Sequence, residues 1–282
     1  MPPAKLKPPS SATQVRLPRF DYDDGVPVTR KLIPAMAQWW MEYCSHHGPL
    51  PALRRMLGIF AEFLSDSTPS RRKQRYGDAD YDWDYRVDTT AATVSWRSRL
   101  LGLFHSAYQP TEPELFRQML GSMDVDFRAF TFIDIGSGKG RALLMAADFP
   151  FERILGIELL PELHRTAQEN INHYLSPSQL CFDVRSVCAD AREFPFPPGA
   201  LLLYLFHPLP EPGLRRLLEN LEQSLRENPR PIYLLYHNSL LEHVLAANAM
   251  LTKVYGTHQF SLYRENPPHP SPPLPGGGMR VK

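Results

Sequence analysis

After Phe127, short apolar runs alternate with amphipathic stretches, and this alternation restricts the fold more than any other feature of the sequence. Runs of roughly four to eight residues, separated by roughly ten to fifteen residues of helical spacing, are typical of a parallel sheet covered on both faces. The apolar runs lie at 130–135, 154–159, 180–187, 200–206, 232–236 and 254–263, and the helical stretches at 141–149, 162–174, 214–226 and 240–251. We therefore predict an α/β domain with a doubly wound, Rossmann-like sheet of about seven strands and helices on both faces.

The rest of the chain flanks this domain. Between residues 28 and 65, apolar residues recur at helical spacing on either side of Gly48-Pro49-Leu50-Pro51, which predicts a helical hairpin. Of the 29 prolines, seven precede Ala35 and six lie within 267–275, a distribution typical of disordered arms. We predict four segments: a disordered proline-rich arm at 1–27, a helical cap and lid at 28–127, a cofactor domain at 128–264, and a disordered proline- and glycine-rich tail at 265–282.

Composition argues against several classes of protein. Lys and Arg total 31 against 30 Asp and Glu, so no global charge attracts nucleic acid or an anionic membrane. The basic run at 71–75 is followed at once by aspartates, which makes a nucleic acid partner unlikely. The longest apolar run, 200–206, is far shorter than the ~20 residues of a membrane-spanning helix. Three cysteines without metal-ligand spacing predict a reduced, cytoplasmic chain with no structural metal.

A glycine-rich segment follows the first apolar run. Residues 133–141 read Ile-Asp-Ile-Gly-Ser-Gly-Lys-Gly-Arg, and glycines at a strand-to-helix turn let a ligand approach the backbone closely. The spacing is GxGxG, which differs from the GxGxxG of dinucleotide sites and from a phosphate-binding Walker loop. The glycines can alternatively serve only tight packing between helix and strand. We expect Lys139 and Arg141 to form a solvent-exposed first helical turn.

Acidic residues follow three successive strands. Asp134 ends the first strand, Glu158 closes the second, and Asp190 follows the third. Because the carboxyl ends of parallel strands share one edge, these acids line the edge where open α/β sheets bind ligands. Glu158 suits the hydroxyls of a ribose, and Asp190 suits the exocyclic amine of an adenine. Such an edge disfavours a pyrophosphate and favours a cationic nucleoside. Two alternatives remain: Asp134 can simply cap the glycine turn, and Glu158 can be an exposed residue at the start of the next helix.

Four segments resemble consecutive motifs of the class I S-adenosylmethionine (SAM)-dependent methyltransferases, in particular bacterial members of unassigned substrate. They are residues 132–141, 156–158, 188–191 and 204–209, within a likeness that covers roughly 108–263. The sequence of the glycine segment is more distantly similar to that of some protein-lysine methyltransferases. The resemblance implies SAM as cofactor, cradled by Gly136, Ser137, Gly138 and Gly140, with its ribose on Glu158, its adenine near Asp190 and Ala191, and its methionine moiety beneath Tyr108 and Thr111.

The same resemblance places the methyl acceptor at the end of the fourth strand. Amine-directed relatives carry Asn or Asp there, then Pro-Pro and an aromatic residue, whereas this chain has Phe206-His207-Pro208-Leu209. His207 is a candidate base, with Phe206 and Pro208 beside it, because imidazole titrates near neutrality. It can equally be an edge histidine without a role. Tyr236-His237-Asn238 forms a second polar cluster at the end of the fifth strand.

Two further expectations concern the region before the domain. Thr111 and Glu114 have the spacing of a capping box, which predicts a helix that starts at Thr111. The aromatic and acidic segment at 76–89, together with the hairpin, is expected to form a lid that selects the substrate.

We predict a SAM-dependent methyltransferase that acts on a protein side chain or a small molecule. One alternative is a non-catalytic SAM-binding or scaffold relative, whose protein partner binds the proline-rich tail. A second alternative, within the same fold, is an oxidoreductase with a nucleotide cofactor.

Overall fold

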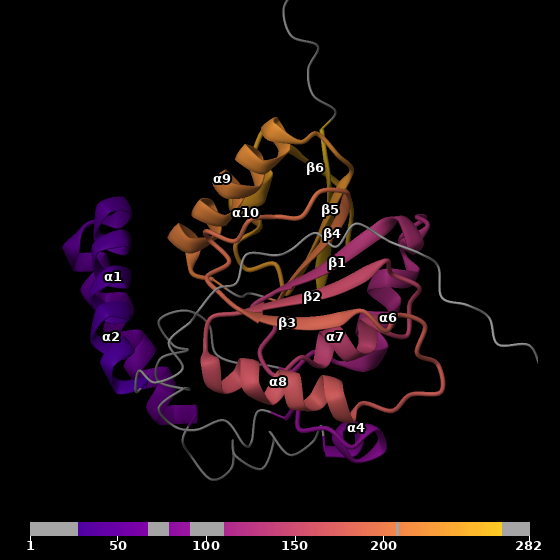
Figure 1. Ribbon diagram of the computed structural model, residues 1–282. Coiled ribbons are helices and arrows are strands. Elements are labelled where there is room, and N and C mark those ends of the chain that lie inside the picture. The colour runs from indigo at the N-terminus through magenta and orange to yellow at the C-terminus, as the bar shows by residue number, and fades with distance from the viewer. Residues whose placement is uncertain (1–27, 67–78, 91–109, 207–208, 267–282) are drawn as a thin grey trace, which may run out of the picture.

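The computed structural model describes residues 28–66, 79–90, 110–206 and 209–266, and its centre is a seven-stranded sheet (Figure 1). The strand order is β3-β2-β1-β4-β5-β7-β6, and only β7 runs antiparallel to its neighbours on both sides. The strands are β1 Phe130–Ile135, β2 Arg153–Glu158, β3 Val184–Cys188, β4 Ala200–Phe206, β5 Ile232–His237, β6 Leu251–Gly256 and β7 Phe260–Glu265. The predicted Rossmann-like α/β fold is confirmed, and the chain reverses its winding direction between β1 and β4, where such sheets bind ligands.

Helices cover both faces of this sheet (Figure 1). One face carries α6 Pro113–Gly121, α7 Arg141–Ala146 and α8 Pro161–His173, and the other carries α9 Glu211–Glu227 and α10 Glu242–Ala246. A short 3-10 helix, Phe127–Ala129, leads into β1. Because successive strand residues point to opposite faces, Phe132 joins the core beneath α6 and α7, while its neighbour Ile133 joins the core beneath α9. No helix within the described ranges is long and apolar enough to span a membrane.

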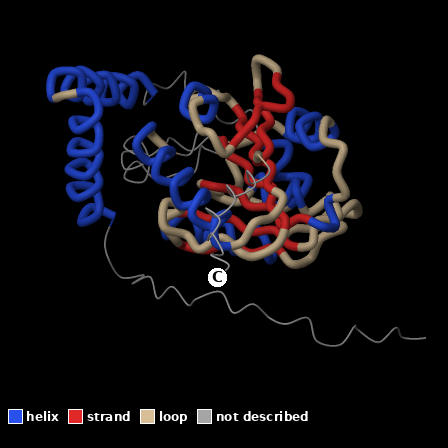
Figure 2. The backbone as a smooth tube through the Cα atoms, turned by 90° about the horizontal axis from the view of Figure 1, so that it is seen from above, coloured by secondary structure: helices blue, strands red, loops and turns tan. Residues whose placement is uncertain are grey.

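The predicted helical hairpin is present. It consists of α1 Val28–His47 and α2 Pro49–Asp66, which meet at Gly48, where the backbone takes a φ of +83° that glycine adopts without strain. Figure 2 shows the hairpin beside the sheet domain. Its buried centre is Trp39, which packs against the partly buried Met36, Trp40, Tyr43 and Met56.

The end of the sheet differs from the sequence prediction. Residues 254–263, expected as one strand, contain the end of β6, a turn, and the start of β7, which form an antiparallel hairpin. The turn is made by Thr257, whose hydroxyl oxygen accepts hydrogen bonds from the backbone N–H groups of Gln259 and Phe260. The turn contains no proline that would have marked it in the sequence. The pattern therefore predicted one strand where the structure has two.

Two other boundaries were also wrong. The helix expected at 240–251 is only the short α10, because β6 already begins at Leu251. The strand expected at 180–187 begins only at Val184, and Leu180 and Phe182 before it are exposed. Apolar side chains next to the true strand and helix made both elements longer in the sequence prediction than they are in the structure.

Lys139 and Arg141 are buried, so the expected solvent-exposed helical turn is wrong. Each side chain is about 2% exposed. Lys139 Nζ donates to Asp88 Oδ1 and to the carbonyl oxygen of Thr90, both at 2.9 Å. Arg141 Nε donates to Thr89 Oγ1 at 2.7 Å. Helical spacing gave no sign of this, because the covering segment lies about fifty residues earlier in the chain.

That covering segment, residues 79–90, begins with the helix α4 Ala79–Tyr85 and is also fastened to the domain by Asn170 of α8. The Asn170 side chain donates to the carbonyl oxygens of Asp88 and Lys139 at 2.8 and 2.9 Å, and accepts from the Asp88 N–H at 2.7 Å. The ring of Tyr85 lies 5.4 Å from that of Tyr174. Part of the expected lid is therefore a packed portion of the domain, while residues 76–78 lie outside the described ranges.

We expect Asn170→Ala to lower the free energy of unfolding by about 2–4 kcal/mol, because it leaves the Asp88 N–H and the carbonyl oxygens of Asp88 and Lys139 without this partner. Chemical denaturation measures the change, and Glu169→Ala, at the exposed neighbouring position, is the control. Equal stability of the two variants would show that residues 79–90 are not held in this way.

Candidate active site

The glycine loop connects β1 to α7 through three residues with positive φ. Gly136, Gly138 and Gly140 have φ angles of +75°, +54° and +87°, which residues with a Cβ adopt at a cost. At Gly140, moreover, a Cβ would lie 3.3 Å from the Ala167 Cβ on α8. The sequence prediction of a tight glycine turn at this edge is therefore matched by the backbone.

The N–H groups of the loop are directed at the protein itself. Those of Gly136 and Ser137 donate to the Ile157 carbonyl oxygen at 2.8 and 3.1 Å. The Gly138 N–H donates to Glu158 Oε2 at 2.8 Å, and the Gly140 N–H donates to the Ser137 carbonyl oxygen at 2.8 Å. A phosphate-binding loop needs N–H groups that point at the ligand. These four N–H groups are already committed, so the loop is poorly suited to a pyrophosphate.

Ser137 faces β2. A Cβ on Gly156 would lie 2.6 Å from the Ser137 Oγ and 2.6 Å from Leu143 Cδ1, so only glycine fits beneath the loop. The Ser137 hydroxyl is buried and has no hydrogen-bond partner among the described residues. In contrast, its backbone N–H and carbonyl oxygen both form hydrogen bonds within the fold. Through these backbone hydrogen bonds, Ser137 stabilises the conformation of the loop.

Two acids predicted from the sequence lie together beside this loop. Asp134 and Glu158 are 4% and 6% exposed. Glu158 accepts hydrogen bonds from the N–H groups of Gly138 and Leu160, at 2.8 and 2.7 Å, whereas Asp134 has no hydrogen bond with any described residue. Burial raises the pKa of both carboxyls, and the negative charge of Glu158 raises the pKa of Asp134 further. Among the described residues, the site therefore holds a buried acid without a hydrogen-bond partner.

Asp190 follows β3 as predicted, but its carboxylate already binds Arg192. Arg192 Nε lies 3.0 Å from each Asp190 oxygen, and Arg192 Nη2 lies 2.6 Å from Oδ2. Arg192 Nη1 also donates to Glu42 of α1 at 3.2 Å, which links the hairpin to this end of the edge. The neighbouring Ala191 is buried. Sequence reasoning missed Arg192, because nothing local distinguishes it from an exposed arginine.

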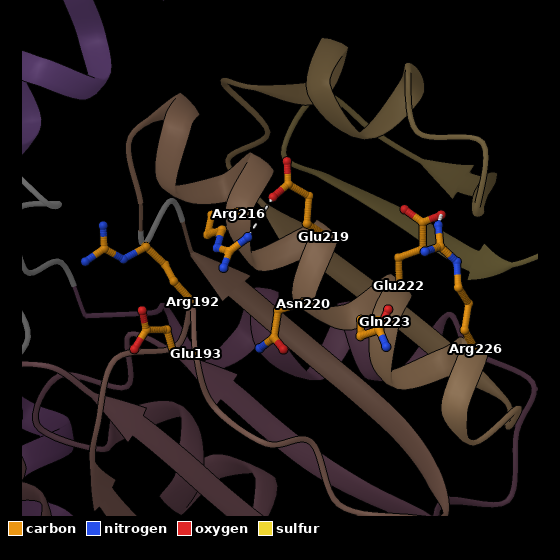
Figure 3. A pocket seen from close by; sticks show the side chains of 8 residues that line it. All are labelled: Arg192, Glu193, Arg216, Glu219, Asn220, Glu222, Gln223 and Arg226. Carbon is orange, nitrogen blue, oxygen red and sulfur yellow. Dashed lines mark hydrogen bonds and ion pairs between the residues drawn. The ribbon is translucent and has the colours of Figure 1, made fainter. Parts of the chain in front are cut away.

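A cleft of about 480 Å³ opens beside Arg192 and Glu193, with α9 as its other wall (Figure 3). The glycine loop does not line it. Its cations are paired with acids in the same wall, as in Arg216 with Glu219 and Arg226 with Glu222. The cleft is therefore mixed in charge and gives no preference for an anion.

Polar side chains also meet where β4 and β5 end. The Tyr204 hydroxyl lies 2.9 Å from Thr111 Oγ1 and 2.8 Å from His237 Nδ1. The His237 ring stacks on Phe206, with centroids 3.9 Å apart. Sequence reasoning ranked His237 second and missed Tyr204, which reads as one more core residue in an apolar run.

The capping box was wrong. Helix α6 begins at Pro113 with Glu112 as its N-cap residue, and no side chain caps it. Thr111 instead directs its hydroxyl to Tyr204. The remaining candidates, Tyr108, His207 and Pro208, lie outside the described residues, so their predicted roles stay predictions.

Comparison with known families agrees with this geometry. Residues 132–228 match the model of a family described as methyltransferase domain. This part of the chain is similar to methyltransferase domains. No curated protein matches the sequence.

Solved structures similar to this part of the chain include three named methyltransferases. The ribosomal protein L11 methylase of Lactobacillus delbrueckii subsp. bulgaricus is 16% identical, over 56% of this chain and 77% of its own, with a TM-score of 0.38. An RNA methyltransferase of Salinibacter ruber, in complex with S-adenosyl-L-homocysteine, is 22% identical over 59% and 98%, with a TM-score of 0.34. The mitomycin 7-O-methyltransferase MmcR is 15% identical over 53% and 52%, about half its length, with a TM-score of 0.39.

We expect Glu158→Ala to destabilise the sheet domain by about 2–4 kcal/mol even without ligand, because it leaves the buried N–H groups of Gly138 and Leu160 unpaired. Urea denaturation of the ligand-free protein measures this, with the exposed Glu152→Ala as control. Unchanged stability of Glu158→Ala would mean that Glu158 does not hold the loop.

Proposed function

We propose that the chain transfers a methyl group from SAM to an acceptor, with SAM held on the glycine loop. The observation that carries this proposal is Asp134, a buried carboxylate beside the loop without a hydrogen-bond partner in the described residues. A buried charge is costly unless a partner of opposite charge compensates it. SAM carries both an ammonium and a sulfonium, so it supplies the missing cation.

The loop supports the same choice over a dinucleotide. The N–H groups of Gly136, Ser137, Gly138 and Gly140 are all used within the fold. A pyrophosphate would therefore find few donors and two acids, Asp134 and Glu158, at this turn. SAM has no phosphate, and it needs from the glycines only the space that a Cβ would fill.

The remaining cofactor contacts follow from positions at the same edge. Each Glu158 oxygen accepts one backbone N–H and retains a lone pair for a ribose hydroxyl. Asp190 and Ala191 would border the adenine, with Asp190 shared between its exocyclic amine and Arg192. Thr111 would border the methionine moiety, together with Tyr108.

The chain's contribution to methyl transfer is to orient the acceptor and exclude water. SAM supplies an electrophilic methyl group when bound, and the acceptor must be held about 3 Å from it with an unprotonated lone pair. We place the acceptor at the ends of β4 and β5, beside Phe206. A protein side chain or a small molecule is the proposed acceptor class.

Isothermal titration with SAM, S-adenosylhomocysteine and NAD tests the cofactor. We expect the first two to bind and NAD not to bind, whereas NAD binding without SAM binding would overturn the proposal. Transfer of radiolabelled methyl groups from SAM into protein, nucleic acid and small-molecule fractions of a lysate then tests the reaction. Binding of SAM without any transfer would contradict the catalytic part.

We expect Asp134→Asn to weaken SAM binding at least tenfold, because the neutral amide loses the charge-assisted hydrogen bond to a cation. The same variant should be more stable than the parent without ligand at pH 7, by about 1 kcal/mol or more. Since folding raises the pKa of Asp134, burial of the ionised form costs stability as pH rises above the unfolded value of about 3.9. The gain should therefore vanish near pH 3.5.

Titration calorimetry and denaturation at the two pH values measure these effects, and Asp124→Asn is the exposed control. Parental SAM affinity in Asp134→Asn would show that the cofactor is placed wrongly. Lower stability of this variant at pH 7 would show that Asp134 has a partner in the fold.

A further inference from the structure

His237 is the last residue of β5 and is held on two sides. Its register partner on β4 is Phe206, whose ring stacks on the imidazole with an interplanar angle of 18°. Its Nδ1 lies 2.8 Å from the Tyr204 hydroxyl. The residue is only 7% exposed, so both the plane and the direction of the ring are fixed.

Tyr204 is itself fixed from the opposite side. Its hydroxyl also contacts Thr111 Oγ1 at 2.9 Å, and both residues are buried. Burial raises the pKa of the Tyr204 phenol well above its ordinary value, so the hydroxyl keeps its single proton at neutral pH. Thr111, Tyr204 and His237 therefore form one connected chain of hydrogen bonds.

This chain lies next to the proposed cofactor position. Tyr204 is the register partner of Asp134 on β1, and β5 follows β4 in the sheet. Neighbouring strands are about 4.8 Å apart, so His237 lies roughly two strand spacings from Asp134 along the edge. The acid and the imidazole thus flank the carboxyl ends of the three central strands.

The second ring nitrogen of His237 has no partner among the described residues. Nδ1 is committed to Tyr204, and Nε2 is directed away from it on the other side of the ring. Nε2 is not among the fully covered side-chain atoms that lack a partner, so the described residues leave it open to a ligand. An acceptor molecule at this edge would supply its hydrogen-bond partner.

We infer that His237 Nε2 binds the methyl acceptor through a hydrogen bond and takes up the proton that the acceptor releases. This inference rests on the proposed function. It places the polar contact to the acceptor on His237, whereas the sequence alone favoured His207. Tyr204 is then a positioning residue, which sets the tautomer and direction of the imidazole.

The environment of His237 also restricts the acceptor's chemistry. Burial lowers the pKa of His237 to about 4, so the imidazole is neutral at physiological pH. A lysine ammonium, with a pKa of about 10.4, would not give its proton to such a base. The acceptor is therefore a neutral, weakly basic N–H or O–H group, such as an aromatic exocyclic amine or a hydroxyl.

The proton transfer balances for this class of acceptor. The acceptor's lone pair forms a bond to the methyl carbon while the bond between that carbon and sulfur breaks, and the sulfonium becomes a thioether. The methylated acceptor is then a strong acid, which passes its N–H or O–H proton to His237 Nε2. The resulting imidazolium returns the proton to water.

Nitrogen-15 spectra of the histidine rings in the full chain test this without knowledge of the acceptor. The probe is S-adenosylhomocysteine, followed by SAM. We expect one neutral imidazole that persists at pH 5, because burial lowers its pKa to about 4, and whose Nε2 signal shifts when either probe binds. Loss of this signal in His237→Gln assigns it, and His243, exposed on α10, is the control that should not shift.

The outcomes separate the two proposals. Binding of SAM and S-adenosylhomocysteine together with equal methyl incorporation by the parent and His237→Gln would overturn this inference and leave the proposed function standing. Failure of both probes to bind would overturn the proposed function and this inference with it. The titration of the unmodified protein is informative even if His237→Gln does not fold.

A positioning role for Tyr204 has its own readout. In Tyr204→Phe, which removes only the hydroxyl, we expect both neutral tautomers of His237 to be populated, while SAM affinity stays within threefold. An unchanged single tautomer would contradict the role of Tyr204.

The acceptor class is tested in the labelled lysate fraction. We expect His237→Gln to lower methyl incorporation at least tenfold at unchanged SAM affinity. Label recovered on the alkyl amine of lysine, or equal incorporation by parent and variant, would overturn the assignment.

Discussion

The Glu158 carboxylate connects three parts of the domain, and the arrangement of the edge depends on it. It ends β2, accepts the Gly138 N–H of the glycine loop, and accepts the Leu160 N–H at the start of α8. A hydrogen bond from a backbone N–H to a buried carboxylate is among the stronger ones in proteins, because the acceptor is ionised. The same group that would bind the ribose is therefore also the one that shapes the loop.

The charges at this edge are distributed unequally. Glu158 is compensated by backbone N–H groups and Asp190 by Arg192, but Asp134 is buried without such a partner in the described chain. The ligand-free protein thus bears a cost that a cationic ligand would remove. Function and stability are opposed at this one side chain, which is typical of binding sites.

Sequence patterns predicted the elements better than their contacts. The periodicity gave the hairpin and the order of strands and helices as far as β5, and it placed acids at the ends of β1 and β2 and after β3, because these depend on local spacing. It failed at Lys139 and Arg141, whose burial depends on residues 79–90, and at Thr111, whose hydroxyl bonds to Tyr204 rather than to its own helix. These contacts join distant segments, so no local pattern encodes them.

The sequence by itself determined the sheet with its glycine turn and the acids at its carboxyl edge, because strand periodicity and glycine spacing are local properties. The tertiary structure decided which polar groups remain for a ligand. It showed that the N–H groups of Gly136, Ser137, Gly138 and Gly140 are already used, that Asp134 has no hydrogen-bond partner among the described residues, and that His237 is fixed by Tyr204 and Phe206. The physical reason is that hydrogen bonds are saturated by neighbours in space, which the order of residues along the chain does not reveal.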